Sequence, residues 1–108
     1  MEFRKVVAIV SRGALEPVET ALRSAGVTGV SVCAIKGFGE YADFYERDWM
    51  TNHVKVEVFT VREKAGAIAH VIMAAAHTGQ EGDGIVAISP VESLFRIRTQ
   101  AAVEHEGA

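Results

Sequence analysis

The chain has 108 residues, of which 49% are hydrophobic, so it can bury the core of one domain, residues 1–108, and has no room for a second. A formal net charge of −3 argues against a general nucleic-acid binder, which needs excess cations to displace counterions from phosphates. The single cysteine, Cys33, has no intrachain partner, and its apolar neighbours predict a small buried hydrophobe in a cytoplasmic protein.

Hydrophobic periodicity predicts four strands and two helices along the chain. The strands are short runs rich in β-branched residues, and the third alternates valines with other side chains. Both helices carry apolar residues at helical spacing; Pro17 falls in the first turn of the first helix, and Gly26 provides its C-terminal stop. In chain order the predicted elements are residues 6–10, 15–25, 29–35, 54–59, 64–77 and 85–88.

This order of two βαβ units predicts a ferredoxin-like α+β fold, in which an antiparallel sheet carries both helices on one face. The second and third strands have apolar residues on both faces, so we expect the uncovered face to be buried against other subunits of an oligomer. The segment between these strands, residues 37–52, has no clean period. Loops of that length in compact domains are usually functional or disordered.

Two glycine pairs, Gly37 with Gly39 and Gly82 with Gly84, fall at strand edges. Neither matches a dinucleotide-binding fingerprint, which needs a third glycine and a following helix. A Walker loop would need a lysine after its last glycine, whereas Ile85 stands there. Each pair taken alone is therefore interpreted as turn chemistry.

Arg96 and Arg98 are two residues apart, a spacing that would project both from one face of a strand about 7 Å apart. Two guanidinium groups at that distance could grip one polyphosphate. The alternative is a solvated strand edge with Phe95 and Ile97 turned inward.

Other candidate sites are incomplete. His70 and His77 share a face of the second predicted helix but lack the third ligand that a zinc or copper site needs, so we expect no metal. Ser11, Ser89 and Cys33 have no evident base and orienting partner, so the sequence gives no argument for hydrolytic catalysis.

Three stretches resemble the PII signal-transduction proteins: GVTGVSVCAIKGFG at 26–39, VKVEVF at 54–59 and TGQEGDGIVAISPVESLFRIRT at 78–99. The resemblance covers nearly the whole chain, in order. It implies a homotrimer that is not an enzyme, binds adenine nucleotides in clefts between subunits, and presents a long loop to a transporter or enzyme. It also implies that residues 37–52 are the T-loop, 78–85 the B-loop and 99–108 a flexible C-terminal tail.

Carried over position by position, the resemblance implies that backbone N–H groups of the B-loop and two arginines hold the phosphates. Ser31 stands where the family usually has a threonine. We expect a small anion such as bicarbonate beside the nucleotide, at Lys55 and Arg98. The implied nucleotide-binding residues are Ile9, Ser31, Lys36, Gly37, Phe38, Gly39, Glu57, Phe59, Gly82, Asp83, Gly84, Ile85, Arg96 and Arg98.

The chain departs from the family pattern at cations that would meet a terminal phosphate. Glu40 and Tyr41 replace an arginine and a glutamine, Ile85 replaces the lysine of GDGK, and His53 replaces a lysine at the base of the T-loop. With these departures, the resemblance implies that ADP or AMP is preferred over ATP as the effector, with no metal required.

Divergent PII-like proteins of this kind are linked to inorganic carbon or metal handling. The leading interpretation is therefore a cytoplasmic regulator of a membrane transporter, for bicarbonate or other inorganic carbon, contacted through the T-loop. Two alternatives stay open: a metal-tolerance protein resembling the CutA trimers, which share the fold, and a structural trimer whose glycine loops are only turns. The TGQEGDG and RIRT stretches favour the PII interpretation.

Overall fold

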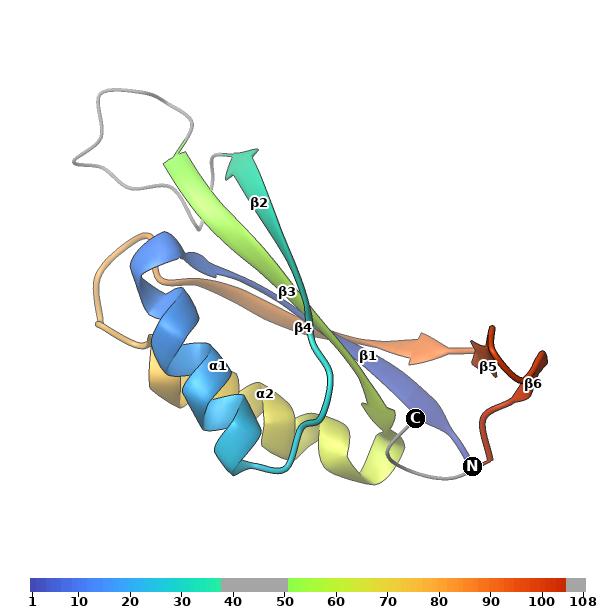
Figure 1. Cartoon of the computed structure of the whole chain (residues 1–108). Helices are drawn as coiled ribbons and strands as arrows, with labels where there is room; N and C mark the ends of the chain where they lie inside the picture. The colour runs from blue at the N-terminus through green and yellow to red at the C-terminus, as the bar shows by residue number, and fades with distance from the viewer. Residues whose placement is uncertain (38–50, 105–108) are drawn as a thin grey trace.

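The computed structural model describes residues 1–37 and 51–104 of the chain (Figure 1). The main elements follow the predicted order, with a short 3-10 helix and a small C-terminal hairpin added. None of the helices within these described ranges is long and apolar enough to cross a membrane. The elements are β1 (Phe3–Ser11), η1 (Arg12–Ala14), α1 (Leu15–Ser24), β2 (Ser31–Gly37), β3 (Thr51–Val61), α2 (Arg62–Ala76), β4 (Gly84–Val91), β5 (Phe95–Arg96) and β6 (Ala101–Ala102).

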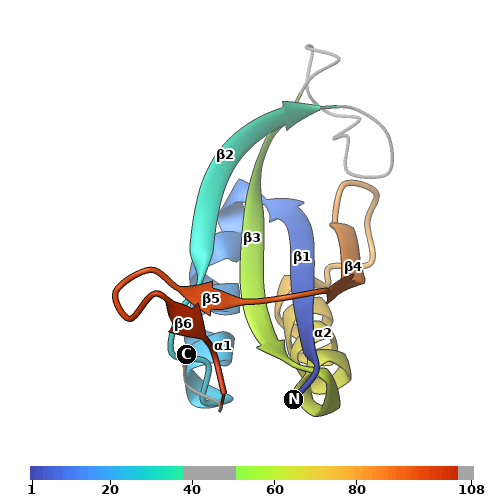
Figure 2. The ribbon, with the colours of Figure 1, turned by 90° about the vertical axis from the view of Figure 1, so that its right-hand side faces the viewer.

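The four long strands form one antiparallel sheet in the order β2-β3-β1-β4, and α1 and α2 cover one of its faces (Figure 2). Val6 in the central strand β1 lies opposite Val58 of β3 and Ile88 of β4. The predicted ferredoxin-like fold is confirmed. β1, β3 and β4 are longer than the apolar pattern predicted, because the backbone ladder continues through polar residues such as Lys5 and His53. β2 has the predicted length and begins two residues later than predicted.

The core lies between the helices and the face of the sheet that they cover. Alternate residues of β1 and β3 point to that face, as the period of a strand requires. Fully burying a valine, leucine or isoleucine side chain of this set contributes about 1.5–3 kcal/mol from its apolar surface. The buried set comprises Val6, Ala8 and Val10 of β1, Val54, Val56 and Val58 of β3, Val18 and Leu22 of α1, and Ile68 and Ile72 of α2.

The predicted stop after α1 is confirmed at Gly26, whose φ is 89°. The Gly26 N–H donates to the Arg23 carbonyl, and the Val27 N–H donates to the Leu22 carbonyl, both at 3.0 Å. Glycine adopts this left-handed conformation without a Cβ clash, and the two bonds satisfy carbonyls that the helix end leaves open. Val27 then packs against the core, which directs the chain into β2.

The face opposite the helices carries the other set of alternating strand side chains. Ile9 lies opposite Ile85 there, and Val7 lies opposite Ala87. Phe59 and Ile85 are 52% and 44% exposed. The β5–β6 hairpin extends from the end of β4 across the front of this face (Figure 2). We call this surface the open face; it presents apolar side chains that the single chain leaves accessible.

Cys33 is exposed, so its predicted burial is wrong for the single chain. Its sequence neighbours are apolar, but it lies opposite Lys55 on β2, the edge strand, on the open face. A residue there has neither a helix above it nor a strand on its outer side. The apolar neighbourhood indicated a strand correctly and did not determine which face the helices cover.

The C-terminal hairpin was not predicted. β5 pairs with β6, and the Val103 N–H donates to the Leu94 carbonyl at 2.9 Å. The expected C-terminal tail, residues 99–108, begins inside the turn of this hairpin and includes β6. Residues 105–108 lie outside the described residues.

Candidate functional site

The residues implied for nucleotide binding are spread over the open face and both ends of β4. Ile9, Lys36, Gly37 and the B-loop glycines lie at one end of the sheet, where β1 and β2 finish and β4 begins (Figure 1). Ser31 and Glu57 are register partners in the middle. Arg96 lies beyond the other end of β4. Phe38, Gly39 and most of the T-loop fall outside the described residues.

The B-loop joins α2 to β4 and is organised by the carboxylate of Asp83. Asp83 Oδ2 accepts from the backbone N–H of Thr78 at 2.8 Å and of Gly79 at 2.9 Å. The Thr78 hydroxyl donates to Oδ1 of the same carboxylate. The carboxylate of Asp83, a residue that we expected to contact the nucleotide, therefore stabilises the loop itself.

These contacts stabilise the charged form of the carboxyl. The hydrogen bond from the Thr78 hydroxyl lowers the pKa of Asp83 most, and the backbone N–H of Thr78 and Gly79 lower it further. His77 adds a smaller effect, with its Nδ1 at 3.9 Å from Oδ2. The loop is consequently held in its closed turn at neutral pH, where the carboxylate is ionised.

Glycine is required at both ends of the GDG sequence. Gly82 and Gly84 have φ of 95° and 111°, a region that other residues rarely adopt. The turn over Glu81 and Gly82 directs the Asp83 N–H toward the Gln80 carbonyl, whereas the backbone N–H groups of Glu81 and Gly82 have no hydrogen-bond acceptor within the described part of the chain. Successive N–H groups in such a turn form a concavity that can bind an anion.

On the open face, Lys55 is already paired. Its Nζ lies 3.4 Å from Oε1 of Glu57, two residues along the same strand. Lys55 was expected to bind a small anion, and Glu57 to contact the nucleotide. An anion at Lys55 must therefore compete with the Glu57 carboxylate, and the pair is half-exposed, so the competition takes place in a strongly screened environment.

The arginines do not share a strand face, and that prediction is wrong. Arg96 ends β5, whereas Arg98 lies in the turn between β5 and β6. The Gln100 N–H donates to the Arg96 carbonyl at 2.9 Å and closes this turn, with Gln100 at a φ of 55°. The alternation of Phe95 and Ile97 resembled a strand, but the chain reverses before Arg98 can join one.

The B-loop and the arginines are also far apart within one chain. Gly84 begins β4 and Val91 ends it, a run of 8 residues. At 3.3 Å per residue this strand separates its ends by about 23 Å, and Arg96 lies further on. The structure does not bring the B-loop and the arginines of one chain together (Figure 1).

His53 is a residue of this site that sequence analysis did not recognise. It is 2% exposed and its Nε2 lies 3.2 Å from the carbonyl oxygen of Gly82 in the B-loop. The sequence marked His53 only as the replacement of a lysine. A contact across 29 residues leaves no local pattern that could have predicted it.

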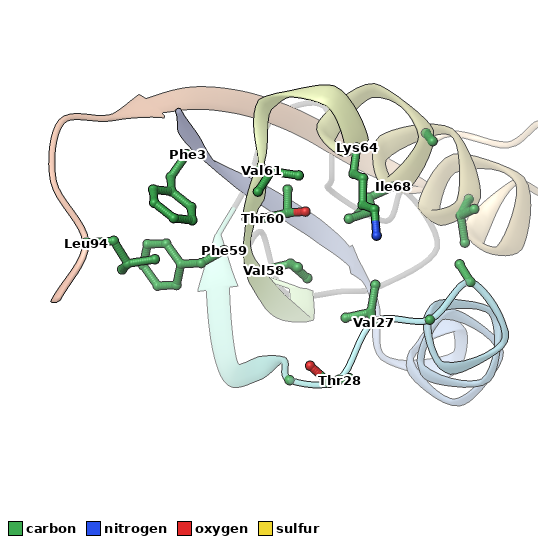
Figure 3. A pocket seen from close by; sticks show the side chains of 15 residues that line it. Phe3, Val27, Thr28, Val58, Phe59, Thr60, Val61, Lys64, Ile68 and Leu94 are labelled. Atoms are coloured by element: carbon green, nitrogen blue, oxygen red, sulfur yellow. The ribbon is translucent and has the colours of Figure 1, made fainter. Parts of the chain in front are cut away.

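A separate cavity of about 330 Å³ lies away from the B-loop, between the α1–β2 connection, the last residues of β3 and α2 (Figure 3). Its walls are largely apolar, and the Lys64 side chain points into it. Phe59 is its one wall residue from the implied nucleotide set. Across residues 1–37 and 51–104, no three His, Cys, Asp or Glu side chains form a group that could hold a metal ion.

Comparison with known proteins shows which family the chain resembles. The family model described as Nitrogen regulatory protein P-II matches residues 3–101. The Nitrogen regulatory protein P-II of Nostoc punctiforme is 37% identical over 104 residues, covering 90% of this chain and 93% of its own. That of Cereibacter sphaeroides is 38% identical over 105 residues, with 90% and 93% covered.

A solved structure, Arabidopsis thaliana PII bound to citrate, superimposes with a TM-score of 0.82 at 33% identity. The match covers 95% of this chain and 90% of that one.

Proposed function

The chain belongs to the nitrogen regulatory protein P-II family, and we propose that it is a non-enzymatic regulator that binds adenine nucleotides between the subunits of a homotrimer. The observation that carries this proposal is the separation of two phosphate-binding elements. The B-loop offers adjacent backbone N–H groups, while Arg96 and Arg98 lie beyond the opposite end of β4, more than about 23 Å along the strand. One nucleotide can meet both elements only if they come from different chains.

The open face supports the homotrimer. It exposes Phe59 and Ile85 beside Val7 and Ile9, an apolar surface of the kind that subunit contacts bury. A cyclic assembly repeats one heterologous contact around an axis, so the hairpin of each chain can reach the B-loop end of its neighbour. Three equivalent nucleotide clefts result.

Within this site we propose that ADP and AMP bind more tightly than ATP. The third phosphate of ATP needs donors when it leaves water, and Ile85 supplies none where the family has lysine. Glu40, outside the described residues, adds a carboxylate where the family has a cation. A missing charge-assisted hydrogen bond costs about 1.5–3 kcal/mol, which corresponds to roughly tenfold or more in affinity.

The proposed partner is a membrane transporter, contacted through the T-loop, whose cargo is bicarbonate or another form of inorganic carbon. This part rests on the resemblance to divergent PII-like proteins. The proposed anion site at Lys55 and Arg98 needs the Lys55–Glu57 pair to open, since Glu57 holds the Lys55 ammonium at 3.4 Å. Bicarbonate binding should therefore be weak in the single chain. The solved Arabidopsis relative is bound to citrate, so small carboxylates should be tested as ligands together with bicarbonate.

Titration calorimetry with ADP, AMP and ATP, each with and without magnesium, tests the proposed function. We expect saturable binding of ADP and AMP and roughly tenfold weaker binding of ATP. Arg98→Ala should weaken ADP and leave adenosine unchanged, because the lost contact is to phosphate. Arg23→Ala, an exposed arginine at the end of α1, is the matched control. Absence of nucleotide binding would overturn the proposal, and an ATP affinity equal to that of ADP would overturn its selectivity.

A further inference from the structure

His53 is the one polar side chain in the buried class among the residues that the structure describes, with 2% of its surface exposed. It lies near the start of β3, opposite Ser11 of β1 and Ile35 of β2. A buried imidazole needs hydrogen-bond partners, because water cannot reach it. One partner is the Gly82 carbonyl of the B-loop.

The geometry fixes the role of the ring in this contact. Nε2 lies 3.2 Å from the Gly82 oxygen, and a carbonyl oxygen can only accept. The imidazole must therefore carry a proton on Nε2 and donate it. The bond ties the loop to a residue 29 positions earlier in the chain, on the interior strand β3 and near the end of the sheet.

The contact also determines where the next backbone N–H points. In a planar trans peptide, the carbonyl of one residue and the N–H of the next point in opposite directions. The Gly82 carbonyl points inward to His53, so the N–H of Asp83 points away from His53, toward the Gln80 carbonyl across the turn. The turn leaves the N–H groups of Glu81 and Gly82 as B-loop donors without an acceptor among the described residues.

Two further contacts hold the same peptide on either side. The Asp83 carboxylate accepts from the N–H groups of Thr78 and Gly79, which closes the start of the loop. Gly84 lies directly against the backbone of Ile9, which fixes its end. His53 supplies a side-chain hydrogen bond to the peptide between them.

We propose that His53 is a positioning residue for phosphate binding: it holds the Gly82–Asp83 peptide with its carbonyl inward, which fixes the turn that presents the N–H groups of Glu81 and Gly82 to a bound phosphate. This inference rests on the proposed nucleotide function and adds to it a residue that touches no ligand. It also gives the lysine-to-histidine departure a specific consequence: a donor that could reach a ligand is exchanged for a donor that orders the B-loop.

Two substitutions separate a hydrogen-bonding role from simple filling of space. His53→Leu keeps an apolar side chain in the buried position and removes the donor. His53→Gln keeps an N–H donor on a side chain of similar length. If His53 only fills space, Leu should serve at least as well as Gln; if it positions the peptide, only Gln should preserve phosphate binding.

Calorimetry with ADP and adenosine measures this difference. We expect His53→Leu to weaken ADP about tenfold with adenosine unchanged, and His53→Gln to recover most of the ADP affinity. His70→Leu, an exposed histidine on α2, is the matched control and should bind like the parent protein. Equal ADP affinity in the parent protein and the folded Leu variant, or equal loss for ADP and adenosine, overturns the inference.

Nuclear magnetic resonance of the parent protein keeps the test independent of nucleotide binding and of variant folding. Nitrogen-15 shifts of the imidazole should show a protonated Nε2, and the N–H resonances of Glu81 and Gly82 should shift on titration with inorganic pyrophosphate. An unprotonated Nε2 overturns the inference, as do Glu81 and Gly82 resonances that pyrophosphate leaves in place. If pyrophosphate moves these resonances but no adenine nucleotide binds, the proposed function fails and the positioning role of His53 stands.

Discussion

Gly84 lies directly against Ile9: a Cβ added to Gly84 would sit 1.8 Å from the carbonyl oxygen of Ile9. The same glycine has a φ of 111°, so a side chain there meets both a backbone clash and an unfavourable conformation. We expect Gly84→Ala to lower the free energy of unfolding by roughly 2–5 kcal/mol, the combined range for overpacking and left-handed strain. Chemical denaturation monitored by circular dichroism measures it.

Gly66 in α2 provides a control of opposite sign. An added Cβ at Gly66 meets nothing within 4 Å. Alanine at an open helical position is better than glycine by about 0.5–1 kcal/mol, so Gly66→Ala should stabilise the protein. A Gly84→Ala variant as stable as the parent would show that β1 and β4 can separate at their ends without cost.

The elements that the sequence predicted correctly are those fixed by local periodicity. Val54, Val56 and Val58 alternate along β3 and are buried along β3, because a strand turns every second residue to the same face. Gly26 ends α1 because only the local backbone decides that position. The predicted burial of Cys33 was wrong because the exposure of this residue depends on where the helices pack. The predicted strand position of Arg98 was wrong because a turn closed by Gln100 follows Arg96.

The contact between Asp83 and Thr78 leads to a prediction about pH. The hydroxyl of Thr78 is the largest cause of the lowered pKa of Asp83, whose ordinary value is 3.8. A depressed folded-state pKa means that the loop contacts contribute stability above the ordinary value and lose it as the pH falls through the folded-state pKa. Carbon-13 titration of the Asp83 carboxyl should therefore show a midpoint below 3.8.

Thr78→Val tests the cause of that shift. Valine keeps the shape of threonine and removes the hydroxyl, so the midpoint of Asp83 should rise toward 3.8. Glu2, whose pKa is lowered chiefly by its hydrogen bond with Arg62, lies outside the loop and serves as the internal control. A Thr78→Val titration that superimposes on the parent would assign the shift to the backbone N–H groups instead.

Cys33 reports on the open face. In the single chain its thiol is exposed opposite Lys55. If the open face is covered in a trimer, a thiol reagent should react slowly at concentrations that hold the assembly together and faster after dilution dissociates it. Sedimentation equilibrium on the same samples gives the oligomeric state. Equal reaction rates for trimer and monomer would place Cys33, and this part of the open face, outside the subunit contact.

The candidate site was less predictable than the fold, because one of its contacts joins residues that are distant in the sequence. The B-loop glycines could be found because GDG is contiguous in sequence. The contact of His53 with Gly82 joins residues that only the folded sheet brings together. Asp83 was predicted to contact the nucleotide as part of the loop. The sequence could not show that its carboxylate binds the loop itself, because a carboxylate in a glycine-rich turn has the same sequence appearance whether it binds the loop or a ligand.

The separation of the B-loop from Arg96 and Arg98 predicts complementation between two defective chains. Gly82→Asp adds a carboxylate to the phosphate-binding turn, and a chain carrying both Arg96→Ala and Arg98→Ala lacks the cations. We expect neither variant to bind ADP as a pure homotrimer. In randomly mixed trimers, a cleft is intact when it takes its B-loop from the arginine variant and its arginines from the loop variant.

In an equimolar mixture, the chain that supplies the B-loop is the arginine variant in about half of the clefts, and the chain that supplies the arginines is the loop variant in about half. Roughly a quarter of the clefts should therefore be intact. Calorimetry of co-refolded chains should then show an ADP stoichiometry near a quarter of that of the parent, with the parent affinity. Chains refolded separately and then combined under conditions that prevent exchange are the control and should bind none. If the B-loop and the arginines of one chain formed the site, no mixture would recover binding, because every chain would carry one lesion. Recovery in mixed trimers alone therefore requires that one nucleotide is held by two chains.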